Sequence, residues 1–200
     1  MIVEDVETLL FLIEAGCASL LMTPVREAAP AASDFLALRI EGVSAWRVAL
    51  RAREIVEATG LEAFVKASST TQLEVLVPVG NAPADAVHVL AALFARLLAR
   101  VAEEAGVKVE RLDAPIAPYA VVLPVVSGYE ATATVSLPLS WNEVEGGVGQ
   151  MSRLDNARAR LAKGVVDPMR GMLAAPVHFA GAVEAIEKMV SAGGFQGGRA

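Results

Sequence analysis

The chain has 200 residues, 54% of them hydrophobic, and its 17 basic and 23 acidic residues give a net charge of −6. The length suits one domain, and the acidic balance argues against an extended phosphate-tracking surface, because such surfaces are cationic. One cysteine and two histidines exclude an internal disulfide and a Cys/His zinc site. No secretory leader is visible, and no stretch of about 20 residues is apolar enough to cross a membrane, so we expect a cytoplasmic protein.

The N-terminal part of the sequence predicts a helix, a strand and a second helix. Residues 4–15 place apolar side chains at helical spacing and end at Gly16. Residues 34–41 alternate in the way that strands do. Ser44 is a suitable cap for a helix that stops at Gly60. This order predicts a β–α unit.

A hairpin and a long helix are predicted next. Residues 61–66 and 73–79 read as two strands around a turn rich in Ser and Thr. Asn81 and Pro83 then open an amphipathic helix, and Gly106 stops it.

The C-terminal part predicts short strands and two weaker helices. Together the elements indicate an α+β domain over residues 1–192, with a mostly antiparallel sheet, helices packed on it and a split βαβ core. The remaining expected segments are strands at 107–112, 119–126 and 130–137, helices near 153–163 and 178–190, and a disordered tail at 193–200.

The segment EAFVKASSTTQLEVLVPV, residues 62–79, resembles a motif of the polymerase domain of bacterial DNA ligase D, a member of the archaeo-eukaryotic primase superfamily used in end joining. That family has Lys-Thr-Ser-Gly-Gly-Lys-Gly-Leu-His between its two strands, where glycines and cations receive a triphosphate. Lys66 and Ser68 match the pattern, whereas Thr71 replaces the second lysine and Glu74 the histidine. The resemblance marks these four residues as remnants of a nucleotide-binding site.

The strand DFLALRIEG, residues 34–42, resembles the family's Asp-x-Asp strand, which holds two catalytic magnesium ions. Arg39 takes the place of the first aspartate and Glu41 that of the second. Glu110 is matched to a third aspartate, although a shift of one residue would place Arg111 there. Magnesium requires carboxylate oxygens and is opposed by a fixed cation at ligand distance. We therefore expect these metal positions to be degenerate, with no bound metal, no cofactor and no catalytic residue.

Two further segments resemble the family's framework: VSLPLSWNEV, residues 135–144, and the stretch 156–173. We expect the Trp141 indole to fill the core and to donate its N–H to a carbonyl group. The basic cluster Arg158, Arg160 and Lys163 is expected to form a solvated face. The resemblance covers roughly residues 5–174 and implies that an N-terminal part of the family domain, with basic residues that grip a 5′-phosphate, is missing.

A retained framework with substituted ligands predicts a pseudoenzyme: an inactive relative of the ligase D polymerase domain that acts as a binding or scaffolding module in DNA repair by non-homologous end joining. The alternative is an active nucleotidyltransferase or nucleotide-binding enzyme, rebuilt around Glu41, Glu74 and Glu110 and using magnesium or manganese. A purely structural subunit that pairs with another chain is a third hypothesis. We expect a homodimer or a protein partner, weak or no nucleic-acid binding and no membrane association.

The substituted metal site also predicts an ion pair. A guanidinium group offers five donors in a fork that suits carboxylate oxygens. The resemblance implies that the strand of Arg39 lies beside those of Glu74 and Glu110, so we expect Arg39 within hydrogen-bonding distance of Glu110 or Glu74. If such a pair is buried, removing one partner costs on the order of 3–5 kcal/mol.

Overall fold

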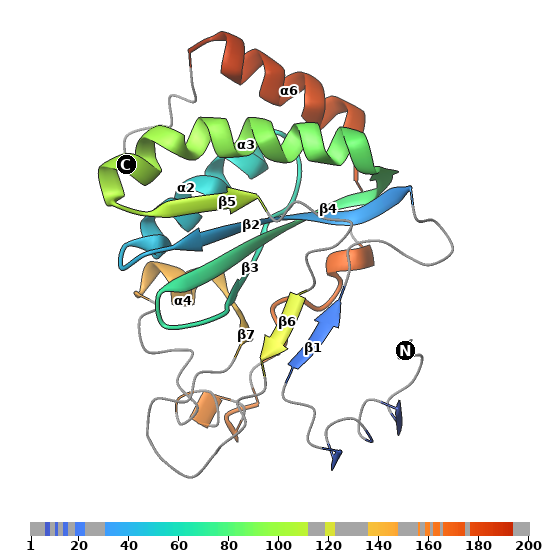
Figure 1. Ribbon diagram of the computed structural model, residues 1–200, viewed down its shortest axis with the longest axis vertical. Coiled ribbons are helices and arrows are strands. Elements are labelled where there is room, and N and C mark those ends of the chain that lie inside the picture. The colour runs from blue at the N-terminus through green and yellow to red at the C-terminus, as the bar shows by residue number, and fades with distance from the viewer. Residues whose placement is uncertain are drawn as a thin grey trace.

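The computed structural model describes residues 7, 8, 11, 14, 15, 19–22, 31–111, 119–122, 136–147, 156, 159, 160, 162–164, 166–174 and 177–193 (Figure 1). Its helices and strands are β1 (Ser19–Met22), β2 (Ala32–Glu41), α2 (Ala45–Ala58), β3 (Phe64–Ala67), β4 (Gln72–Pro83), α3 (Ala84–Ala105), β5 (Lys108–Arg111), β6 (Tyr119–Val122), β7 (Leu137–Leu139), α4 (Trp141–Glu145), the 3-10 turn η1 (Met172–Ala174) and α6 (Phe179–Ser191).

Five strands form one antiparallel sheet in the order β5-β2-β4-β3-β7. From β2 to β5 the chain runs strand, helix, strand, strand, helix, strand, with β2 and β4 at the centre. This is the split βαβ arrangement, and β7 adds a fifth strand beside β3. The predicted α+β class with its mostly antiparallel sheet is therefore confirmed. Strands β1 and β6 pair separately as an antiparallel ribbon.

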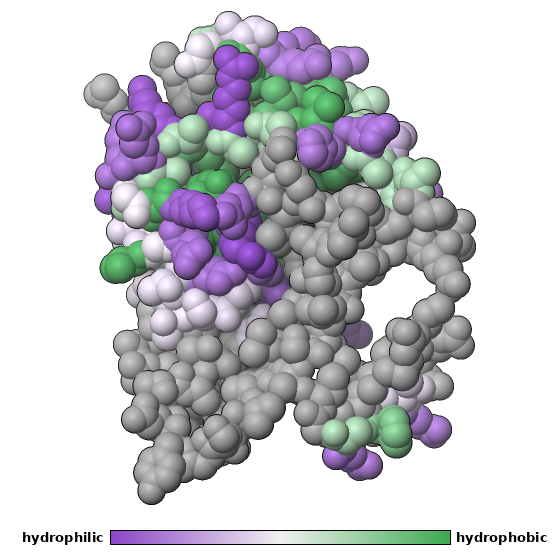
Figure 2. Space-filling view, viewed as in Figure 1, coloured by the Kyte–Doolittle hydropathy of each residue, from purple (hydrophilic) through white to green (hydrophobic). Residues whose placement is uncertain are grey.

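Helices α2 and α3 cover one face of the sheet, and α6 packs on α3 (Figure 1). Alternation along β2 turns Leu38 and Ile40 toward these helices, where they meet the apolar stripe of α3 that contains Leu90, Phe94 and Leu98. All five side chains are fully buried. The main core therefore lies between the sheet and its helices. On the surface, Figure 2 shows hydrophilic and hydrophobic residues interspersed over the described helical part of the molecule.

The opposite face of the sheet has a smaller apolar cluster. Phe35, Ala37 and Leu76 are buried there, and Met169 and Met172 pack against them. Because side chains alternate along a strand, Arg39 lies on the same face as Phe35 and Ala37. This face is therefore apolar at one end and charged at the other.

Strand β4 is longer than predicted. It continues past Val79 to Pro83, and the register changes between Ser33, which faces Ala82, and Phe35, which faces Pro78. The extra β4 residues form a bulge in which Gly80 and Asn81 have φ values of 63° and 62°. Glycine and asparagine adopt this left-handed conformation at low cost. Asn81 thus belongs to a bulge and not to the start of the helix, which begins at Ala84.

Other boundaries differ less. Strand β3 begins at Phe64 and not at residue 61, and β1 and α4 were not predicted. Helix α6 lies one residue from its predicted bounds. Described residues at 7, 8, 11 and 14, and at 156, 159, 160 and 162, are helical as expected.

The predicted strand segments 123–126 and 130–135 and the tail residues 194–200 lie outside the described residues. Within the described part of the chain, no helix is both long and apolar enough to cross a membrane.

Candidate functional site

Four charged side chains form a row across the sheet. Glu110 on β5, Arg39 on β2, Glu74 on β4 and Lys66 on β3 are successive partners in the strand register. Residues directly opposite one another project from the same face. The charges alternate in sign, so acids and bases compensate one another along what we call the charge row.

Arg39 and Glu74 form the central contact of the charge row. Arg39 Nη2 donates to Glu74 Oε1 at 3.4 Å. The Glu74 side chain is 4% exposed and that of Arg39 is 33% exposed. The predicted approach of Arg39 to Glu74 is therefore confirmed. Loss of Glu74 would leave the nearly buried Lys66 without this acid, whereas loss of Arg39 would leave Glu74 facing Lys66. We therefore expect the large cost of breaking a buried pair on loss of Glu74 and a smaller cost on loss of Arg39.

Lys66 is the second cation against Glu74. Its Nζ lies 3.0 Å from Glu74 Oε2, and both side chains are less than a tenth exposed. This approach is an ion pair without the alignment of a hydrogen bond. Lys66 Nζ also donates to Ser136 Oγ at 3.2 Å. Each oxygen of the Glu74 carboxylate thus faces its own cation.

Glu110, at the edge of the charge row, contacts Lys108 on its own strand. The hydrogen bond and the charge of Lys108 lower the pKa of Glu110, and the charge of Arg39 adds to this effect. In return Glu110 raises the pKa of Lys108, with a smaller contribution from Glu41. Glu41 is exposed at the end of β2, where it faces Gln72 and Lys108 in the register. Each of the two carboxylates matched to metal ligands, Glu41 and Glu110, therefore faces or contacts a cation of the protein.

Ser68 and Thr71 lie outside the charge row. The Ser68 amide donates to Gln72 at 2.9 Å, next to the hairpin turn. Thr71 is exposed, and its carbonyl accepts a bond from the Gly42 amide at 2.8 Å. Thr71, Gly42 and Trp46 help to line a cavity of about 20 Å³, a volume that suits a water molecule and not a nucleotide. The structure thus brings together Lys66 and Glu74 of the four expected remnants.

The described residues do not fit a metal site. Among them, no group of three or more His, Cys, Asp or Glu side chains is arranged to hold a metal ion. Arg39 stands between Glu110 and Glu74 in the register, so a cation there would meet a guanidinium group.

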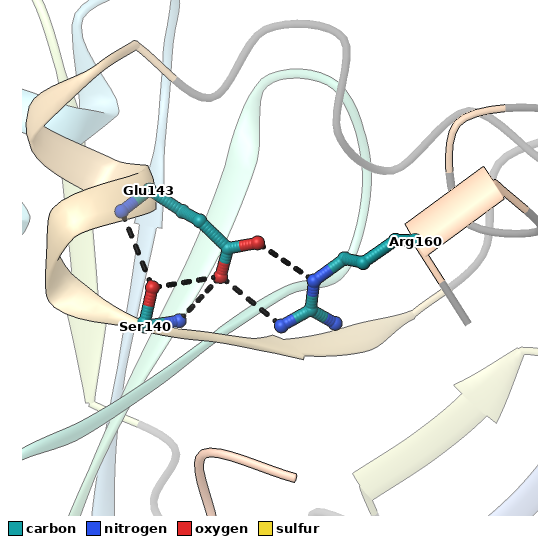
Figure 3. A network of polar contacts seen from close by, with 3 residues as sticks. All are labelled: Ser140, Glu143 and Arg160. Carbon is teal, nitrogen blue, oxygen red and sulfur yellow. Dashed lines mark hydrogen bonds and ion pairs between the residues drawn. The ribbon is translucent and has the colours of Figure 1, made fainter. Parts of the chain in front are cut away.

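A second polar network joins the segment around Arg160 to helix α4 (Figure 3). Arg160 Nε and Nη2 donate to Glu143 Oε1 and Oε2 at 2.7 and 3.0 Å. Ser140 donates to Glu143 Oε2 through its amide at 2.7 Å and its hydroxyl at 2.9 Å. Burial raises the pKa of Glu143, but the bonds from Arg160 and Ser140 outweigh burial and lower it.

Arg160 was expected on a solvated face, and this expectation is wrong. Its side chain is 11% exposed because it lies against Glu143. Lys163 is exposed, whereas Arg158 lies outside the described residues. The spacing Ser-x-x-Glu at Ser140 and Glu143 is a capping-box pattern that could have revealed the acidic partner.

Trp141 links α4 to the residue that precedes β3. Its indole Nε1 donates to the Ala63 carbonyl at 2.8 Å, as predicted, and the Arg53 guanidinium lies 5.3 Å from the ring centroid. The segment matched to the family's framework therefore packs as a framework element.

Comparison with known proteins supports the fold. A scan against protein-family models finds no match, and no curated protein matches the sequence. Among solved structures, the polymerase domain of ligase D from Mycobacterium tuberculosis, in complex with DNA, aligns with a TM-score of 0.63 and 18% identity over 88% of this chain and 70% of that one. The two chains share a fold. The structural relationship expected from the sequence motifs is thus confirmed at that level.

Proposed function

We propose that this chain is a catalytically inactive relative of the ligase D polymerase domain, acting as a binding or scaffolding module in DNA end joining. The observation that carries the proposal is the ion pair between Arg39, at the position matched to a metal-binding aspartate, and Glu74. The shared fold supports a related nucleotidyltransferase-type architecture.

The charges of the site support inactivity. Two-metal catalysis depends on carboxylate oxygens that are open to the ions. Here Glu74 faces Arg39 and Lys66, and Glu110 contacts Lys108. A metal ion would have to displace these cations. The charge row itself would contribute little to the binding of a triphosphate, because its two bases already face two acids.

A site rebuilt around Glu41, Glu74 and Glu110 has less support. Glu74 and Glu110 flank Arg39, while Glu41 faces Lys108 and Gln72. A cation therefore lies between or beside each of the three acids. This arrangement separates the carboxylates that the rebuilt enzyme would have to bring together.

Primer extension with manganese and ribonucleotides tests the proposed inactivity. A ligase D polymerase domain assayed in parallel is the positive control, and Glu41→Ala is the matched variant. We expect no template-dependent extension by this chain. Extension that is lost in Glu41→Ala would contradict the proposal and favour the rebuilt enzyme.

A scaffolding role requires a partner, and we propose a second copy of the chain. The hydrophobic content of 54% supports self-association. Light scattering should give twice 20.9 kDa. A mass near the single-chain value at every concentration would contradict the homodimer.

A further inference from the structure

Strand β5 is one edge of the five-stranded sheet, and among the described strands it pairs only with β2. In this pairing Lys108 faces Glu41, and Glu110 faces Arg39. The side chains of Lys108 and Glu110 are 68% and 38% exposed, and they contact each other along the strand. The edge therefore carries one base and one acid on the same face of the sheet.

The backbone groups of Val109 point away from β2. The Gly42 amide donates to the Thr71 carbonyl next to β4, so Gly42 directs its backbone toward β4. Successive residues of an antiparallel strand alternate in this direction, so Glu41 and its partner Lys108 direct their backbone toward each other. Val109, the next residue, then presents its N–H and C=O groups to the side of β5 that lies away from β2.

The other edge of the sheet, β7, is less suited to pairing. The Ser68 amide donates to the Gln72 carbonyl of β4, so Lys66, two residues earlier, also directs its backbone toward β4. Pro138 faces Lys66 and so occupies a position whose N–H would point outward, a group that proline lacks. A partner strand would therefore find more hydrogen-bonding groups on β5 than on β7.

The charges of β5 complement those of a second copy in one register. Charged residues on an edge strand oppose pairing when like charges meet. In a symmetric antiparallel pair centred on Val109, however, Lys108 of each copy faces Glu110 of the other. A pair centred on Lys108 or on Glu110 would instead place two bases or two acids opposite each other.

The register centred on Val109 also continues the charge row. In one copy the row ends at Glu110, an acid. The next position would be Lys108 of the second copy, a base, followed by Glu41 of that copy, an acid that faces Lys108 on β2. The alternation of sign is thus kept across both copies.

We propose that β5 is the interface between two copies of the chain, which pair edge to edge into one continuous antiparallel sheet with Val109 on the two-fold axis. This inference rests on the homodimer of the proposed function and specifies its interface. Lys108 and Glu110 of the two copies form ion pairs on both sides of the axis.

Charge reversal tests this interface, with the mass measured by light scattering. Lys108→Glu and Glu110→Lys should each weaken the dimer roughly tenfold or more, because each places like charges opposite one another on both sides of the axis. An equimolar mixture of the two variants should recover a dimer with one copy of each, since every base then faces an acid. Arg100→Glu, which reverses an exposed charge on α3, is the matched control and should leave the dimer unchanged.

Dimers of the single variants as stable as those of the unchanged protein would overturn the interface and leave the homodimer standing. A mixture that stays monomeric would also overturn it. A single-chain mass of the unchanged protein at every concentration would contradict the homodimer itself, and the interface with it.

Hydrogen exchange of the unchanged protein decides the question if a variant fails to fold. The Val109 amide should exchange roughly tenfold or more slowly in the dimer than in the monomer, because only the second copy supplies its acceptor. Equal exchange rates of this amide at concentrations below and above dimer formation would overturn the proposal.

Discussion

Arg39 and Glu74 face each other across strands β2 and β4, and the guanidinium Nη2 lies 3.4 Å from the carboxylate Oε1. In the resembled polymerase domain the position of Arg39 is matched to a carboxylate that binds metal. A group of acids at this place would need bound cations. Because Arg39 replaces one of the acids, the charge row contains a cation of its own. The charge row therefore compensates its own charges at the positions that the resemblance matches to a catalytic site.

Replacement of Glu74 by Gln should cost more stability than replacement of Arg39 by Ala. Glu74 is nearly fully buried against Arg39 and Lys66, so losing its charge should cost about 3–5 kcal/mol. Arg39 is a third exposed, and its removal should cost about 1–2 kcal/mol. Urea unfolding measures both values. An Arg39→Ala cost equal to or greater than that of Glu74→Gln would contradict this account.

Glu143 should make stability depend on pH in the acid range. Its folded-state pKa lies below the usual value of 4.5 because the bonds from Arg160 and Ser140 outweigh burial. The stabilisation is therefore complete above that value and is lost as the pH falls through the folded-state pKa. Glu143→Gln should cost about 1–2 kcal/mol at neutral pH, allowing for solvent screening. Unfolding curves from neutral to acid pH test this, and identical slopes for both proteins below pH 4.5 would refute it.

The double change Arg39→Asp with Glu41→Asp should create affinity for manganese. The new carboxylates would lie near Glu74 and Glu110 and would repel them without metal, so the melting temperature should fall. Manganese at a hundredfold excess over its Kd should restore about 2.7 kcal/mol. Arg39→Gln, which removes the cation without adding a ligand, should show no response to manganese. An equal response in the unchanged protein would show that the substitution of Arg39 is not what prevents binding.

DNA binding should be weak at physiological salt and should depend little on salt concentration. The net charge is −6, and the cations of the described sheet face, Arg39, Lys66 and Lys108, each contact or face an acid. Few counterions would then be released on binding. Fluorescence anisotropy with a duplex that carries a 5′-phosphate measures this. Nanomolar affinity at about 0.15 M salt would be incompatible with it.

The periodic spacing of apolar residues predicted the central helices and strands well, because burial of one face of an element imposes that spacing. The α3 stripe through Leu90, Phe94 and Leu98 and the alternation along β2 are direct consequences of packing one face. The bulge in β4 was missed because Gly80 and Asn81 also suit a turn before a helix, and only pairing with β2 distinguishes the two. Helix α4 was missed because five residues are too short for a periodic pattern.

At the site, the resembled fold placed the strand of Arg39 beside those of Glu74 and Glu110, and charge then predicted that the guanidinium contacts one of these acids; the partner found is Glu74. Which of the nucleotide-binding remnants lie in the charge row, and which lie outside it, could not be predicted in the same way. Whether Lys66 and Thr71 lie together depends on the register of the hairpin and on which face each strand presents. The pairing of Arg160 with Glu143 depends on tertiary packing between segments 17 residues apart.

The most direct test of the central claim is calorimetric titration of the unchanged protein with magnesium and a ribonucleoside triphosphate. Arg39 and Lys66 hold the Glu74 carboxylate, and Lys108 holds that of Glu110, so the account predicts no binding heat at micromolar concentrations. A micromolar dissociation constant for the nucleotide that requires magnesium would contradict it, because a metal ion would then be bound at a site that the charge row should close.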